Sequence, residues 1–140
     1  MFLNLLNDKQ KELFLELANH ALLIDGHVKE EELGVFESFK LETGLFDYTL
    51  KKTPTKDILM HLSGASKKAQ KAIIIEILGI LVSDIDIDEG EDINRDEQAF
   101  VEQMATQWNI NKRSLKQMQR WVEDFDELLD DGWDLINNKK

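Results

Sequence analysis

One pattern at the start of a helix occurs twice in this chain, 65 residues apart. Residues Asp25–Glu32 precede one segment with helical spacing of apolar residues, and residues Gly90–Glu97 precede another. Self-similarity at a fixed offset indicates repeated structural units, so two matched helical units are expected. With Val28 aligned to Ile93 and no gap, the further matched pairs are Glu31 with Asp96, Glu32 with Glu97, Phe36 with Val101, Phe39 with Met104, and Leu45 with Ile110.

Apolar residues recur at helical spacing through most of the chain. The expected helices are Asp8–Ile24, Lys29–Gly44, a short one after Thr53–Pro54, Ser66–Val82, one from Asn94, and one after Asn109 that ends near Gly132–Trp133. The predicted fold is therefore all-α, a compact bundle of about six to seven helices with a pseudo-twofold internal repeat. Residues 1–140 are expected to form a single domain, with repeat halves at roughly 8–64 and 65–137.

The segment Ser66–Val82 is apolar on nearly every side, which is typical of a central buried helix. Its β-branched run Ile73–Ile75 also suits a strand, but Glu76 and the length of the apolar segment favour a helix. At the start of the next helix, Asn94 and Glu97 have the spacing of a capping box, in which each side chain accepts a hydrogen bond from the other residue's backbone N–H.

Composition excludes several classes of function. The 28 acidic and 17 basic residues give a net charge of -11, which repels nucleic-acid phosphates and anionic lipid headgroups. The chain has no cysteine, and its longest apolar stretch, Ala72–Val82, is too short to cross a bilayer and contains Glu76. We therefore expect a cytoplasmic protein that binds neither nucleic acid nor membrane; the oligomeric state is left open.

Acidic residues are concentrated in two places, while many lysines lie between residues 51 and 71. The carboxylates of the last helix are interpreted as a solvated face, as most charge runs are. The first acidic group comprises Asp84, Asp86, Asp88, Glu89, Glu91, Asp92, Asp96 and Glu97. The second comprises Glu123, Asp124, Asp126, Glu127, Asp130, Asp131 and Asp134.

Two units of this kind around a very apolar central helix resemble the TerB-like tellurite-resistance family. The likeness extends roughly from Leu13 to Leu129, although Lys29 replaces a capping side chain and the loop from Ile85 to Asp92 is longer and more acidic than the pattern needs. The residues that carry the resemblance are Asp25, Gly26, Val28 and Glu32 in the first half, and Ile93, Asn94 and Glu97 in the second.

The resemblance implies a helical bundle without catalytic activity, linked to stress, phage and metalloid resistance, with an acidic patch near the repeat loops that binds metal. A related version forms the N-terminal part of a membrane-anchored J-domain co-chaperone. This chain contains neither that anchor nor a His-Pro-Asp motif. A co-chaperone-type interaction domain is therefore kept as an alternative.

The acidic loop partly fits a calcium-binding helix-loop-helix, whose twelve-residue loop supplies oxygen ligands at fixed positions. Starting at Asp86 places Asp88, the Asp92 carbonyl, Asn94 and Glu97 at ligand positions. However, Gly90 stands where an oxygen ligand is expected and Glu91 where the sharp turn needs glycine, so a regular EF-hand is not expected.

Carboxylates this close together repel one another unless a cation, a basic partner or water offsets their charge. Three interpretations stay open: a divalent cation, with Ca²⁺ favoured over Mg²⁺; a basic protein surface; or a hydrated loop. The predicted metal ligands are Asp86, Asp88, Asp92, Asn94 and Glu97, with Asp25, Glu32, Asp84 and Glu91 as secondary candidates.

The usual catalytic patterns are missing from the sequence. There is no phosphate-binding glycine loop, nucleophile elbow or Cys-His pair, and no histidine has a helix-spaced histidine partner. His20 lies four residues after Glu16, a spacing that favours a surface pair, and all three tryptophans are expected to pack between helices. The predicted function is a non-enzymatic module that acts through an acidic surface on a divalent cation, a protein partner, or both; the alternative is a metal-dependent enzyme that uses the loop carboxylates.

Overall fold

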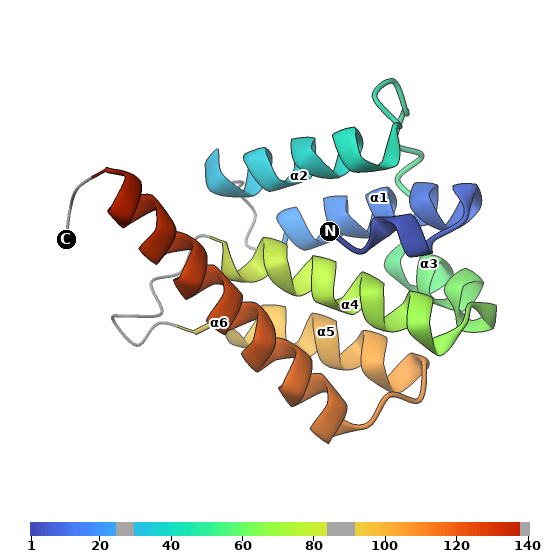
Figure 1. The fold of residues 1–140 in the computed structure, drawn as a ribbon. Helices are drawn as coiled ribbons and strands as arrows, with labels where there is room; N and C mark the ends of the chain where they lie inside the picture. Colours follow the sequence, from blue (N-terminus) through green and yellow to red (C-terminus); the bar gives the residue numbers. More distant parts are fainter. Residues whose placement is uncertain (25–29, 84–91, 138–140) are drawn as a thin grey trace.

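Helices make up all of the regular secondary structure in the described part of the chain (Figure 1). This computed structural model describes residues 1–24, 30–83 and 92–137, without the side chains of residues 30–32. The predicted all-α bundle is confirmed. The elements are the 3-10 helices η1 (Leu3–Leu5) and η2 (Leu62–Gly64), and the α-helices α1 (Asp8–Leu22), α2 (Glu30–Thr43), α3 (Thr55–His61), α4 (Lys67–Val82), α5 (Arg95–Gln107) and α6 (Lys112–Ile136).

Helix α4 lies across the middle of the molecule and packs against α1, α2, α5, α6 and η1 (Figure 1). Its isoleucines at positions 73, 74, 77 and 80 are fully buried, which confirms the predicted central helix and excludes a strand at this run. None of the helices in the described ranges combines the length and apolar character needed to cross a bilayer.

A single core joins the two halves of the chain. Phe14 packs edge-on against Phe39 with 4.8 Å between ring centroids, and residues from both halves belong to the same buried cluster. Those residues include Phe36, Phe39, Ile73, Ile77, Leu81, Val101 and Met104. That the halves superpose through a pseudo-twofold axis stays a prediction.

Side chains cap four of the helices. Asn7 and Gln10 form a capping box before α1, so the N-cap is Asn7 and the helix begins at Asp8. Ser66 accepts a hydrogen bond from the Ala69 N–H before α4, and Asn111 accepts one from the Ser114 N–H before α6. The predicted box of Asn94 and Glu97 is present before α5. Local sequence thus determines where these helices start.

A buried carboxylate holds the long connection between α2 and α3. Glu16, on α1, is 2% exposed and accepts hydrogen bonds from the Tyr48 hydroxyl at 2.8 Å, the Lys51 N–H at 2.7 Å and the Thr53 N–H at 3.2 Å. Burial raises the pKa of Glu16, but these hydrogen bonds outweigh it and lower the pKa overall. The predicted surface pair of Glu16 with His20 is wrong, because the imidazole Nε2 instead lies 2.6 Å from the Thr53 carbonyl oxygen.

Helix α6 is longer than expected and only partly covered. It runs through Gly132 and Trp133 to Ile136, beyond the predicted end. Leu115, Met118 and Val122 in its first part are buried against the bundle, whereas its last part extends past the other helices (Figure 1). We refer to Lys112–Val122 as the N-terminal half of α6 and to Glu123–Ile136 as its C-terminal half.

Candidate functional site

Two of the predicted metal ligands, Asn94 and Glu97, cap the N-terminus of α5. The Asn94 side-chain oxygen accepts a hydrogen bond from the Glu97 N–H at 2.9 Å, and the Glu97 Oε1 accepts one from the Asn94 N–H at 2.9 Å. Glu97 is 6% exposed. The predicted capping contact is therefore confirmed, and it engages oxygens that a cation would need.

The third described ligand, Asp92, lies beside a carboxylate that sequence spacing did not indicate. Its Oδ1 accepts the Ile93 N–H at 2.8 Å, and its side chain meets Glu123 on α6. Burial raises the pKa of the Glu123 carboxyl, and the neighbouring Asp92 carboxylate raises it further. Two carboxylates from distant parts of the chain thus face each other next to the predicted metal loop.

The other predicted ligands, Asp25, Asp84, Asp86, Asp88 and Glu91, lie outside the described residues, as does the side chain of Glu32. Within the described ranges, no group of three or more metal-binding side chains is found. The calcium site therefore stays a prediction.

The C-terminal half of α6 carries a stripe of exposed apolar side chains. Phe125 is 37% exposed, Leu128 70% and Trp133 57%, and Leu129, Leu135 and Ile136 are also exposed. The stripe continues the buried face of the N-terminal half, but its side chains stay exposed in the described part of the structure. The interpretation of Trp133 as a packed residue is wrong, since more than half of this residue is exposed.

Aromatic rings form the base of this stripe. Trp121, which is 43% exposed, stacks on Phe125 with 5.4 Å between ring centroids and an interplanar angle of 17°. Trp121 also packs against Phe2, with 5.9 Å between ring centroids. A small pocket of about 290 Å³ lies next to Trp121, between Phe2, Ile75 and Met118. The stripe, which we define as Trp121, Phe125, Leu128, Leu129, Trp133 and Ile136, is therefore anchored to the bundle at one end.

The polar face of this half of α6 is uniformly acidic. Seven carboxylates occur between residues 123 and 134, and no lysine, arginine or histidine occurs between residues 121 and 138. With about 3.6 residues per turn, most of them lie opposite the stripe, while Asp124, Asp126 and Asp131 border it. Burial, together with the charges of Asp130 and Glu127, raises the pKa of Asp126 to about 6.

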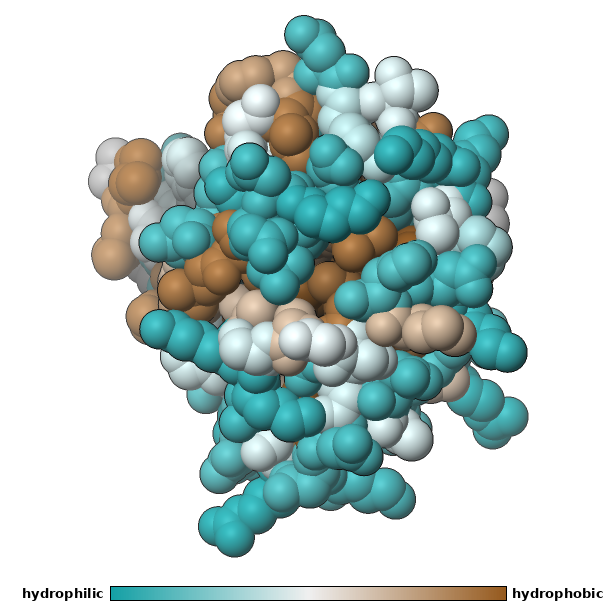
Figure 2. Space-filling model, turned by 90° about the vertical axis from the view of Figure 1, so that its right-hand side faces the viewer, coloured by the Kyte–Doolittle hydropathy of each residue, from teal (hydrophilic) through white to brown (hydrophobic). Residues whose placement is uncertain are grey.

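The apolar stripe contrasts with the face shown in Figure 2, where hydrophobic residues lie among larger hydrophilic areas.

A scan against protein-family models, a search of curated proteins and a search of solved structures each found no match for this chain. The TerB-like resemblance therefore depends on the motif residues alone.

Proposed function

We propose that this chain is a non-enzymatic, TerB-like helical module that binds a partner protein through the C-terminal half of α6. The observation that carries the proposal is the stripe, in which Leu128, Leu129, Trp133 and Ile136 are each more than half exposed. Contiguous exposed apolar side chains with a polar border are typical of protein-binding surfaces. Tryptophan and phenylalanine are also the kind of anchor that dominates binding energy at interfaces.

Charge identifies the kind of partner that fits. A partner must cover the stripe and also approach Asp124 and Asp131 on one side and Asp126 on the other. An amphipathic helix whose apolar face is bordered by lysine or arginine meets both conditions, since helix pairing is a recurrent binding mode. Approach of such cations would also relieve the repulsion that raises the pKa of Asp126.

A second copy of the chain fits the stripe less well. Pairing two C-terminal halves would bring two sets of seven carboxylates together, between molecules that each carry a net charge of -11. Like charges slow association and oppose it, most strongly at low ionic strength. We therefore propose a basic partner protein and not self-association.

A pair of synthetic amphipathic peptides tests this proposal by calorimetry. One peptide combines leucine with lysine, and the other has the same leucine pattern with glutamate in place of lysine. We expect the lysine peptide to bind, the glutamate peptide not to bind, and affinity to fall as salt is raised. Equal binding of both peptides, or no binding of either, contradicts the proposal.

Matched variants locate the binding surface. Leu128→Asp with Leu129→Asp places two charges in the stripe, whereas Leu33→Asp with Leu41→Asp places the same charges at exposed leucines of α2. The first variant should lose peptide binding and the second should retain it. Sedimentation of the unmodified chain completes the test, because a dimer that the first variant abolishes indicates self-association instead.

The pathway is proposed from the resemblance alone. Asp25, Gly26, Val28 and Glu32, with Ile93, Asn94 and Glu97, favour a role in stress or metalloid (tellurite) resistance. Deleting the gene in its host and comparing growth with and without tellurite tests this assignment. Equal growth of the two strains contradicts it.

Calcium binding is a second candidate function, favoured by the contact of Asp92 with Glu123. A divalent cation would offset the repulsion between them, and the predicted ligands Asp86 and Asp88 belong to the same acidic segment of the sequence. An irregular oxygen site of this kind should bind Ca²⁺ with a dissociation constant on the order of 10⁻⁵ to 10⁻³ M.

Thermal unfolding with calcium or with a chelator tests the metal candidate. At about 100-fold excess of calcium over the dissociation constant, binding should stabilise the fold by roughly 2.7 kcal/mol. Asp86→Asn with Asp88→Asn should abolish this stabilisation, and Glu123→Gln should reduce it. Coincident melting curves at millimolar calcium and in chelator contradict a metal site and leave the protein partner as the explanation of the acidic loop.

A further inference from the structure

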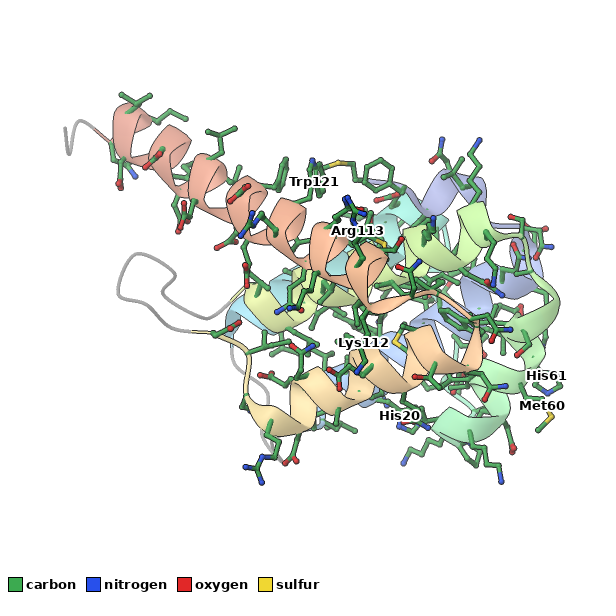
Figure 3. The ribbon with its side chains drawn as sticks, turned by 90° about the horizontal axis from the view of Figure 1, so that it is seen from below. His20, Met60, His61, Lys112, Arg113 and Trp121 are labelled. Atoms are coloured by element: carbon green, nitrogen blue, oxygen red, sulfur yellow. The ribbon has the colours of Figure 1, made fainter. Side chains whose placement is uncertain are left out.

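A groove along the N-terminal half of α6 has the opposite charge to the rest of the molecule. It has a volume of about 810 Å³ and lies between this helix and the start of α5. Lys112, Arg113, Lys116 and Arg120 contribute to its wall, together with the amide side chains of Gln98 and Gln119. Figure 3 shows Lys112 and Arg113 at the start of α6.

Among the described residues, these four cations have no ion-pair partner. The chain has 28 carboxylates, yet within the described ranges none lies within 4.0 Å of any of the four side chains. The groove does contain Asp92 and Glu123, but they face each other at its acidic end. The cationic part of the groove is therefore open to an anion from solution.

This arrangement of cations also destabilises α6 itself. Lys112 and Arg113 occupy the first turn of α6, where the positive end of the helix dipole disfavours cations. Lys112, Lys116 and Arg120 follow one another at intervals of four residues, so neighbouring like charges also repel. A bound anion would relieve both effects, and the helix N-terminus would add its own attraction.

The chemistry of the groove indicates the class of anion. Arginine presents a planar pair of N–H donors that matches phosphate oxygens, lysine adds a point charge, and glutamine amides donate further hydrogen bonds. The volume is in the range of small-molecule sites, which is about 300–1,000 Å³. Asp92 and Glu123 would accept hydrogen bonds from hydroxyl or amino groups at the other end of the ligand.

We propose that this cationic groove binds a small phosphorylated molecule, with its phosphate or diphosphate group held by Lys112, Arg113, Lys116 and Arg120. The proposal is independent of the partner-binding stripe, which begins at Trp121 and follows the C-terminal half of the helix.

Calorimetry with inorganic pyrophosphate tests the groove directly. We expect one saturable site per chain, with affinity that falls as salt is raised. Malonate, a carboxylate dianion, should bind more weakly, because it does not match the phosphate geometry that arginine recognises. A nucleoside diphosphate that binds more tightly than pyrophosphate would show that the ligand is a phosphorylated metabolite; the reverse order would show that free pyrophosphate is the better ligand. If titration with pyrophosphate gives no more heat than dilution alone, the proposal is overturned.

Charge-matched variants distinguish a site from general attraction to cations. Lys116→Glu with Arg120→Glu should weaken pyrophosphate binding by about tenfold or more, since charge-assisted hydrogen bonds are lost. Lys51→Glu with Lys56→Glu makes the same change in net charge away from the groove and should leave affinity nearly unchanged. If the groove variant fails to fold, Lys116→Gln with Arg120→Gln replaces it. The proposal is overturned if the groove and control variants lose the same amount of pyrophosphate affinity. It is also overturned if pyrophosphate changes the NMR chemical shifts of all lysines, or if a polyglutamate peptide binds more tightly at the same residues.

Discussion

Helices α5 and α6 pack side by side against α4, but acidic and basic residues are placed differently at their ends. The first turn of α5 contains Asp96 and Glu97, which suit the positive N-terminal end of a helix. The first turn of α6 contains no acidic residue but begins with Lys112 and Arg113, and its last turn contains no basic residue but includes Asp134. Of these two helices, only α5 has charges in its first turn that stabilise a helix.

The two helices also differ in what they bury. Val101, Met104 and Ala105 place the inner face of α5 in the core, whereas the apolar face of α6 is covered only in its N-terminal half. The sequence of α5 is thus explained by its own fold, but neither the charge order nor the exposed stripe of α6 is. This difference is the reason for proposing that the exposed part of α6 contacts other molecules.

The largest expected difference is between the two halves of α6. Leu115 is 3% exposed and Leu128 is 70% exposed. Leu115→Ala should lower the free energy of unfolding by about 2–5 kcal/mol through the cavity it leaves. Leu128→Ala should change it by less than about 0.5 kcal/mol, as surface substitutions do. Urea unfolding measures both, and a large loss in Leu128→Ala would mean that the stripe is covered within the molecule.

A smaller effect is expected at the cap of α5. Glu97→Ala removes the acceptor for the Asn94 N–H and should lower the free energy of unfolding by about 0.5–2 kcal/mol. Glu97→Gln should lose less, because glutamine also completes a capping box. Thermal melts of both variants without added metal measure these losses. An unchanged melting curve for Glu97→Ala would count against the cap.

The opposite charge order of the two helices predicts opposite signs for one kind of substitution. Asp134→Asn should raise the free energy of unfolding by about 0.3–1 kcal/mol, because it removes a negative charge from the negative end of α6. Asp96→Asn should lower it by a similar amount, because it removes a favourable charge from the start of α5. Urea midpoints at low salt measure both values, and equal signs would refute the dipole explanation.

The smallest effect concerns pH and Asp126. Its pKa is raised from 3.8 to about 6 in the folded state, so between these values the folded chain binds more protons than the unfolded chain. This group therefore adds stability as pH falls from about 7 to 4, and solvent reduces the size of the effect. Asp126→Asn should be more stable than the unmodified chain at pH 7, with the gap closing near pH 4. If the difference in stability between Asp126→Asn and the unmodified chain does not change with pH, this titration is excluded.

Local patterns explain how much of the fold was predictable. The central helix follows from the apolar run around Ile73–Ile75, and the start of α5 follows from the spacing of Asn94 and Glu97, since both depend on neighbours in sequence. Glu16 was misjudged because its partners, Tyr48, Lys51 and Thr53, are more than 30 residues away.

The candidate surfaces were less predictable for the same reason. The contact of Asp92 with Glu123 joins a loop to a distant helix, and no linear spacing indicates it. The sequence predicts that α6 ends near Gly132, but a single glycine costs a helix only about 1 kcal/mol. The cationic groove did have a signal in sequence, namely Lys112, Lys116 and Arg120 at intervals of four residues.

The three tryptophans occupy environments that an optical experiment can separate. Trp108 is 1% exposed and its Nε1–H donates to the Leu59 carbonyl oxygen at 3.0 Å, whereas Trp121 and Trp133 are exposed. Indole fluorescence shifts to shorter wavelength when water is removed from the ring. Docking of a partner on the stripe should therefore shift the emission of Trp121 and Trp133 to the blue and protect them from quenching by iodide, while the emission of Trp108 changes only when the core unfolds. The emission of Trp108 would thus report on folding, and that of Trp121 and Trp133 on the proposed binding.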